Sequence, residues 1–237
     1  MRRANESEIN EFQKNYCCSE KNRNKIKDNF NIKIESFEQL IPGQKIQSYA
    51  TGQREIEGSF IIFQVVNSVN QISYYPVFSE TVGRKLSKAC DLSLPSKMSI
   101  FKSSSKGKST SKNTDRPKTN RKPDNKQMLS LICFSRAMMI LHASTPKPMH
   151  GPFKDIYDKL YNNPSYDVFE SDIKSINSAI RNFMSSSTNK KHENFTNLQN
   201  FIKYLQHQNF KQKLIDPDFS MLREKFHKKY PNEMIVF

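Results

Sequence analysis

A polar, basic stretch at residues 96 to 126 divides this chain into two parts with different sequence patterns. Beyond Phe101 the stretch contains no apolar side chain other than proline and is rich in Ser, Lys, Arg and Thr. A segment that buries no apolar surface has nothing to offset the entropy lost on folding. We therefore expect a disordered basic linker here, with a folded part on each side of it.

The part before the linker, residues 31 to 95, has the pattern of a small α+β module. Ile32 and Ile34 alternate with polar residues, and Ser59–Val66 is a β-branched and aromatic run typical of a buried strand. The four residues after this run have the length of a hairpin loop, so Gln71–Phe78 is expected to return as the partner strand. A short helix, capped by Ser79 or Thr81, is expected next from the spacing of three apolar residues: Val82, Leu86 and Ala89.

Two smaller features complete this part of the chain. Pro76 has no N–H to donate, which predicts that its strand lies at an edge or ends there. Residues 1 to 30 are mostly polar and charged, and we expect them to form a mobile arm with at most one short helix.

Residues 127 to 237 have the periodicity of a helical bundle. Apolar residues at three- and four-residue steps predict about five helices, at residues 128–141, 153–160, 169–183, 195–205 and 217–230. The first is apolar almost all round, with Arg136 as its only charge, as expected for the central helix of a bundle. Any side of it left uncovered would suit a protein partner. For the last helix, Asp216 is the expected cap, Pro217 the first helical position and Pro231 the terminator.

The fold class expected from these patterns is α+β and mostly helical. It comprises a β-hairpin-containing module, a disordered basic linker and a C-terminal bundle.

The last three expected helices resemble a three-helix homeobox-like or helix-turn-helix unit, whose final helix enters the major groove of DNA. Here that helix carries four basic residues away from its apolar stripe: Arg223, Lys225, Lys228 and Lys229. The Trp-Phe-x-Asn sequence of the homeodomain's third helix is absent. The resemblance therefore implies contact with the DNA backbone and leaves out the adenine-reading Asn.

The charge of the chain indicates a polyanionic partner. Its 38 Lys and Arg exceed its 23 Asp and Glu, giving a formal net charge of +15. Neutralising phosphates releases condensed counterions, so such a chain is suited to nucleic acid. Abundant Asn, Lys and Ser also indicate an AT-rich genome, which raises Lys content independently of function. The expected phosphate contacts on the linker are Lys106, Lys108, Lys112, Arg116, Lys118, Arg121 and Lys122, with the four basic residues of the last helix as a second surface.

No complete signature of an enzyme occurs in the sequence. Gly107-Lys108-Ser109 has the end of a phosphate-binding loop, but Lys102 stands where the loop needs its first glycine. Asn163-Pro164-Ser165-Tyr166 resembles the Asn-Pro-Pro-Tyr motif of amino-group methyltransferases, with Ser165 in place of the second proline. The resemblance implies a site for a target amine, yet no Gly-rich turn for a methyl donor accompanies it.

Cysteine and histidine spacing supports no cofactor or metal. Cys17 and Cys18 are adjacent, and no pair among the 4 cysteines has CxxC spacing. The 5 histidines are scattered and form no HExxH. This cysteine usage fits a reducing compartment, and we expect the nucleus, with a cytosolic or mitochondrial assembly as the alternative. No apolar run reaches the roughly 20 residues of a membrane span, so no membrane partner is expected.

The function we expect is that of a non-catalytic, DNA-favouring accessory or scaffolding subunit in a complex that acts on nucleic acid. One alternative is a structural protein of an RNA–protein assembly of the ribosomal type. Another is a degenerate methyltransferase-like enzyme, and a third is a protein-only adaptor. A further hypothesis is a platform for stacking single-stranded bases, made by five residues of the first module: Tyr74, Tyr75, Phe78, Arg84 and Lys85.

Overall fold

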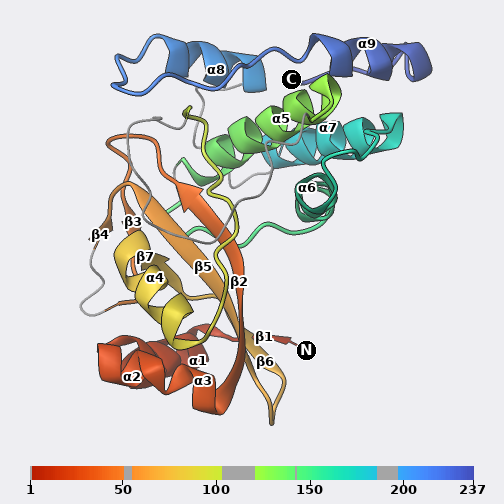
Figure 1. Ribbon diagram of the computed structural model, residues 1–237. Helices are drawn as coiled ribbons and strands as arrows, with labels where there is room; N and C mark the ends of the chain where they lie inside the picture. The colour runs from red at the N-terminus through yellow and green to blue at the C-terminus, as the bar shows by residue number, and fades with distance from the viewer. Residues whose placement is uncertain (1, 51–54, 103–120, 142, 186–196) are drawn as a thin grey trace. The chain divides into compact units, whose positions relative to one another are not determined.

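The computed structural model describes residues 2–50, 55–102, 121–141, 143–185 and 197–237 (Figure 1). Its chain divides into two compact units. The N-terminal unit comprises residues 1–99 and 140–149, and the C-terminal unit comprises residues 100–139 and 150–237. Together they make a mixed α+β protein, as the sequence patterns predict. Residues 103–120, most of the expected linker, lie outside the described residues.

The N-terminal unit is built around strand β5 (Ser59–Asn67). On one side β5 pairs antiparallel with β2 (Phe30–Gln39), and on the other it pairs with β6 (Ile72–Tyr74) and β7 (Val77–Ser79). Figure 1 shows β5 and β2 side by side along their length. The short β1 (Arg2–Arg3) runs parallel to β6 at the edge, and β3 (Ile46–Gln47) and β4 (Glu55–Ile56) form a separate two-stranded sheet. The expected hairpin is therefore confirmed.

Pro76 interrupts the return strand of this hairpin. Val65 pairs with Tyr74 on one side of the proline and Ile62 with Val77 on the other, in a single unbroken register. The Phe63 N–H donates to the Pro76 carbonyl across the gap at 3.1 Å. Because proline can accept but cannot donate, the ladder loses one bond there and continues.

The apolar run of β5 is buried on both faces because each face packs against its own core. Side chains that alternate along the strand divide between the two clusters. Ile61, Phe63 and Val65 pack with residues of the helices and of β2, whereas Phe60 and Ile62 pack with Ile46, Ile56 and Ile140.

The first thirty residues differ from the expected mobile arm. They form α1 (Glu6–Phe12), a π-helical turn η1 (Gln13–Cys17), α2 (Glu20–Asn24) and α3 (Ile26–Asn29). Phe12, Cys17 and Ile26 are buried, and the Phe12 ring stacks on Tyr74 with 4.4 Å between centroids. Asn5 and Glu8 make a reciprocal capping box at the start of α1. Three well-placed apolar residues are thus enough to dock an otherwise polar segment.

Helix α4 (Glu80–Ala89) follows β7 directly, as expected, with Ser79 at its N-cap position and no side-chain cap bond. The aromatic residues before it do not form the open stacking platform considered from the sequence. Tyr74 and Phe78 are buried in the core, while the Tyr75 hydroxyl accepts a hydrogen bond from Gln64 at 2.9 Å. Rings that fill the core of a small module cannot stack on bases.

The C-terminal unit contains the five helices predicted from periodicity. They are α5 (Pro123–Ile140, of which Ile140 falls in the N-terminal unit), α6 (Pro152–Asn162), α7 (Glu170–Ser185), α8 (Leu198–Gln206) and α9 (Ser220–Lys229). Most of α5 is buried on all sides, Arg136 included, as expected for a central helix. The described ends of the expected linker also belong to this fold. Ile100 and Phe101 are buried, and Pro123 begins α5.

Helix α9 begins later than predicted. Its first residue is Ser220, and Asp218 accepts from the Ser220 N–H at 2.9 Å, while Asp216 accepts from the Asp218 N–H at 3.1 Å. The prediction that Asp216 caps the helix and Pro217 opens it is therefore wrong. These two residues belong to an extended segment whose turns are closed by the aspartates. The predicted end is confirmed, since α9 ends just before Tyr230 and Pro231.

The segment after α9 packs into the bundle, which the sequence patterns did not predict. Val236 and Phe237 are buried, and the Leu198 N–H donates to the Val236 carbonyl at 3.1 Å. Asn177 of α7 donates to the Met234 carbonyl at 2.9 Å and accepts from the Val236 N–H at 3.0 Å. A fully buried side-chain amide thus holds this segment as a neighbouring strand would.

Candidate nucleic-acid interface

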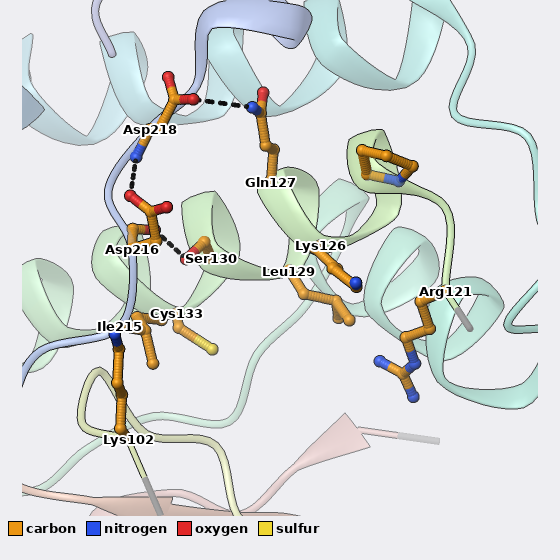
Figure 2. A pocket seen from close by; sticks show the side chains of 11 residues that line it. Lys102, Arg121, Lys126, Gln127, Leu129, Ser130, Cys133, Ile215, Asp216 and Asp218 are labelled. Atoms are coloured by element: carbon orange, nitrogen blue, oxygen red, sulfur yellow. Dashed lines mark hydrogen bonds between the residues drawn. The ribbon is translucent and has the colours of Figure 1, made fainter. Parts of the chain in front are cut away.

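The C-terminal unit contains a cavity of about 530 Å³ beside the first half of α5 (Figure 2). Three segments of this unit line it: Lys102, the start of α5 with the residues before it, and the extended segment that precedes α9. The described residues on either side of positions 103–120 are Lys102 and Arg121, and both line this cavity. It is large enough for one small ligand.

Three basic residues line the cavity: Arg121 and Lys126 on one side, and Lys102 beside Ile215 on the other (Figure 2). Figure 2 shows Arg121 and Lys126 on the same side, with Leu129 beside Lys126. Across the described part of the chain, no carboxylate lies within ion-pair distance of these three side chains. Arg121 and Lys126 also stand near the N-terminus of α5, where the helix dipole adds partial positive charge. This side is therefore suited to an anion.

The opposite side carries Asp216 and Asp218, whose carboxylates are tied into the protein. Asp218 accepts from the Ser220 N–H at 2.9 Å, from the Ser220 hydroxyl at 3.1 Å and from the Gln127 amide at 3.3 Å. The two bonds from Ser220 hold the pKa of Asp218 below its usual value. Asp216 accepts from the Asp218 N–H, and its carbonyl accepts from the Ser130 hydroxyl at 2.7 Å.

Between the two charged sides the wall is mostly apolar. It is formed by Pro123, Leu129, Cys133 and Ile215. Leu129 and Cys133 are the half-buried residues of an otherwise buried stretch of α5. The part of α5 left uncovered is thus small, and it lines this cavity instead of forming a broad exposed surface.

The linker residues proposed from the sequence are only partly described. Lys106, Lys108, Lys112, Arg116 and Lys118 lie outside the described residues. Arg121 lines the cavity, whereas Lys122 forms an ion pair with Asp167. The sequence patterns did not single out Lys102 or Lys126 as site residues. They belong to the same charge surplus, but only the fold brings them together with Arg121.

The basic residues of α9 are used mostly within their own unit. Arg223 donates to the Phe237 carbonyl at 2.9 Å, and Lys225 donates to the Val168 carbonyl and pairs with Asp124 at 3.6 Å. Lys229 lies 3.9 Å from Glu170. Lys228 is exposed, with no ion pair to a described residue. Among the four, Lys228 is the residue most available to an external phosphate.

The methyltransferase-like motif forms a local turn. The Asn163 side chain accepts from the Ser165 N–H at 3.1 Å, and the Tyr166 hydroxyl donates to Asp172 at 2.9 Å. Asp172 also accepts from the Phe169 N–H at 3.0 Å, next to the start of α7. The side chains of Asn163 and Tyr166 thus both have structural partners.

Neither a metal site nor a membrane span is found among the described residues. They include no cluster of three or more His, Cys, Asp or Glu that would hold a metal ion. None of the helices within the described ranges has the length and apolar character needed to cross a bilayer. Comparison of the chain with known protein families, curated protein sequences and solved structures finds no match.

Proposed function

We propose that this chain is a non-catalytic nucleic-acid-binding subunit, with DNA favoured over RNA, that serves a complex acting on nucleic acid. The observation that carries the proposal is the basic lining of the cavity, where Lys102, Arg121 and Lys126 have no carboxylate within ion-pair distance among the described residues. The surrounding C-terminal unit has 23 Lys and Arg against 12 Asp and Glu. Phosphates are the natural counterpart of such a surface.

The basic linker residues extend this interface in the proposal. They are Lys106, Lys108, Lys112, Arg116, Lys118, Arg121 and Lys122. They follow Lys102 and precede Lys126 in the chain, and both of these flanking residues line the cavity. Backbone contacts of this kind give affinity without reading sequence.

The homeobox-like arrangement of α7, α8 and α9 is the second way in which this unit would contact DNA. It is supported by the order of the helices and by Lys228. We place the main interface at the cavity, because three of the four basic residues of α9 are bonded within the unit. The segment between α8 and α9, residues 207–219, is also longer than the short turn of a helix-turn-helix unit.

The protein-partner half of the proposal rests on exposed apolar side chains, and the nuclear location rests on the cysteine usage alone. Since α5 is largely covered, contact with a partner is proposed for four side chains of the same unit: Phe169, Tyr204, Met221 and Met234. They are 43–64% exposed.

Fluorescence anisotropy with labelled duplex DNA, single-stranded DNA and RNA, between about 50 and 200 mM salt, tests the proposal. We expect log K to fall linearly and steeply with log salt. Arg121→Gln with Lys126→Gln should weaken binding to each ligand and lower the slope by about 1 for each phosphate that the variant no longer binds. Lys21→Gln with Lys25→Gln, two exposed lysines of the N-terminal unit, is the matched control.

The outcomes separate the alternatives. Tight RNA binding without affinity for DNA would favour the structural protein of an RNA–protein assembly. Absence of binding to all three ligands at low salt would overturn the proposal and leave the protein-only adaptor.

A further inference from the structure

The lining of the cavity has three chemical features that match the parts of one nucleotide: positive charge, a carboxylate acceptor and an apolar wall. Cations stand on one side, at Arg121 and Lys126, and the Asp216 carboxylate stands on the other. The wall between them is apolar, formed by Leu129, Cys133 and Ile215 (Figure 2). A phosphate alone would use only the first of these features, and an apolar ligand would use only the wall.

We infer that this cavity binds a single nucleotide unit whose base carries an exocyclic amino group, with the phosphate toward Arg121 and Lys126 and the amino group toward Asp216. The inference rests on the proposed function and specifies its ligand. The two aspartates disfavour a run of phosphates, since a second phosphate on their side would meet two carboxylates against the single cation of Lys102. One phosphate on the basic side and a base on the other avoids that repulsion.

The number of hydrogen bonds that each aspartate already accepts indicates which bases fit. Asp218 already accepts three hydrogen bonds, whereas Asp216 accepts one on a carboxylate oxygen, from the Asp218 N–H at 3.1 Å. A carboxylate offers about four acceptor positions and no donor. Adenine, cytosine and guanine present an exocyclic amino donor to it. Uracil and thymine have no amino group, and the single N3–H donor of their pairing edge lies between two carbonyl oxygens that a carboxylate repels.

A base inside the cavity has consequences for the form of nucleic acid that binds. In a duplex the bases are paired and stacked, and moving one out costs a few kcal/mol. Single strands and strand ends avoid this cost. The nucleotide held in the cavity belongs either to a single strand or to a free nucleotide, and competition between the two distinguishes these sources.

The half-buried Cys133 thiol lies in the cavity wall and reports occupancy. In the full chain, N-ethylmaleimide modification at Cys133 is followed by mass spectrometry, with half-buried Cys90 of the N-terminal unit as an internal control. Millimolar AMP or CMP should slow modification of Cys133 at least threefold and leave Cys90 unchanged. UMP, adenosine and inorganic phosphate should protect much less.

Equilibrium dialysis of labelled AMP measures binding directly and decides the case in which Cys133 is unreactive. The double variant Arg121→Gln with Lys126→Gln should weaken AMP binding at least tenfold. The double variant Lys21→Gln with Lys25→Gln should leave AMP binding unchanged. Displacement of AMP by a short oligo(dA) strand would assign the cavity to a strand nucleotide. An AMP complex that the strand does not displace would assign it to a free nucleotide.

Parallel anisotropy measurements with oligonucleotides keep the two proposals apart. If oligonucleotides bind with a steep salt dependence while AMP and CMP neither bind nor protect Cys133, the nucleotide inference is wrong and the proposed function stands. Equal protection by UMP and AMP would overturn the role of Asp216. If no oligonucleotide binds, the proposed function fails whatever AMP does.

Discussion

The two units of this protein contain nearly the same number of acidic residues but very different numbers of basic ones. The N-terminal unit has 15 Lys and Arg against 11 Asp and Glu, and the C-terminal unit has 23 against 12. A genome-wide bias toward Lys codons would enrich both units alike. The excess in one of them therefore indicates a local requirement for positive charge.

Among the described residues, both units pair some of their basic side chains and leave others unpaired, and they differ in where the unpaired ones lie. In the N-terminal unit Arg2, Lys45 and Arg84 pair with glutamates at 2.5–2.9 Å, on an exposed surface where each pair adds little stability. In the C-terminal unit Lys102, Arg121 and Lys126 line one cavity, and none of the three has a carboxylate within ion-pair distance among the described residues. The proposed function uses this gathering of unpaired cations, and the N-terminal unit has no equivalent in that proposal.

Truncating the aromatic core should give the largest effect and test whether binding belongs to the C-terminal unit alone. Phe78 is fully buried against Phe63, so Phe78→Ala should lower the free energy of unfolding by about 3–5 kcal/mol in urea denaturation. Val69→Ala, at a side chain 93% exposed in the same unit, should change it by less than about 0.5 kcal/mol. Folded Phe78→Ala protein should bind nucleic acid as the wild type does. A loss of binding by the folded variant would place part of the interface in the N-terminal unit.

The next largest effect is expected from replacing the basic linker residues. Replacing all seven with Gln or Ser should weaken DNA binding at about 100 mM salt by about 100-fold, equivalent to about 2.7 kcal/mol, and flatten the salt dependence. The control replaces exposed lysines of the N-terminal unit with Gln: Lys14, Lys21, Lys25, Lys27 and Lys88. Anisotropy measures both variants. Equal losses per charge removed, seven in the linker and five in the control, would mean that net charge, and not its location, determines affinity.

Sequence patterns predicted the regular elements because each has a clear apolar period. The strand Ser59–Asn67 and the five C-terminal helices were found in this way, since alternation and three- and four-residue steps follow directly from strand and helix geometry. The first thirty residues were misjudged because their buried residues are few. Phe12, Cys17 and Ile26 acquire their role only from the sheet face they meet.

The candidate site was less predictable than the fold. The charge surplus pointed to the region around Lys102 and Arg121, but a linear count does not show which charges are paired. Lys122 and Lys225 are held by Asp167 and Asp124, residues that lie far from them in the sequence. The cavity itself depends on the segment before α9, which was predicted to be helical from Pro217 and is extended.

The C-terminal unit should prove more sensitive to the removal of a polar side chain than its bundle fold suggests. Asn177→Ala removes the acceptor of the buried Val236 N–H and should lower the free energy of unfolding by about 1–3 kcal/mol. The Met234 carbonyl keeps a bond from Arg181 at 2.7 Å, which limits the effect. Asn182→Ala, an exposed site on the same helix, is the control in urea denaturation. Equal stabilities of the two variants would show that apolar packing alone holds the last residues in place.

The smallest effect concerns pH and distinguishes a structural Tyr166 from a catalytic one. Burial, together with the Asp172 carboxylate that accepts the hydroxyl hydrogen bond, raises the pKa of Tyr166 from 10.0 to about 12. A raised pKa means that this hydrogen bond stabilises the fold fully below pH 10 and that its contribution disappears as the pH rises through about 12. The stability difference between wild type and Tyr166→Phe should therefore be constant up to pH 10 and shrink above it, as measured by urea denaturation at each pH. Tyr166→Phe should leave DNA binding unchanged. A difference that already falls below pH 10 would contradict the hydrogen bond to Asp172, and a loss of binding would give this tyrosine a functional role.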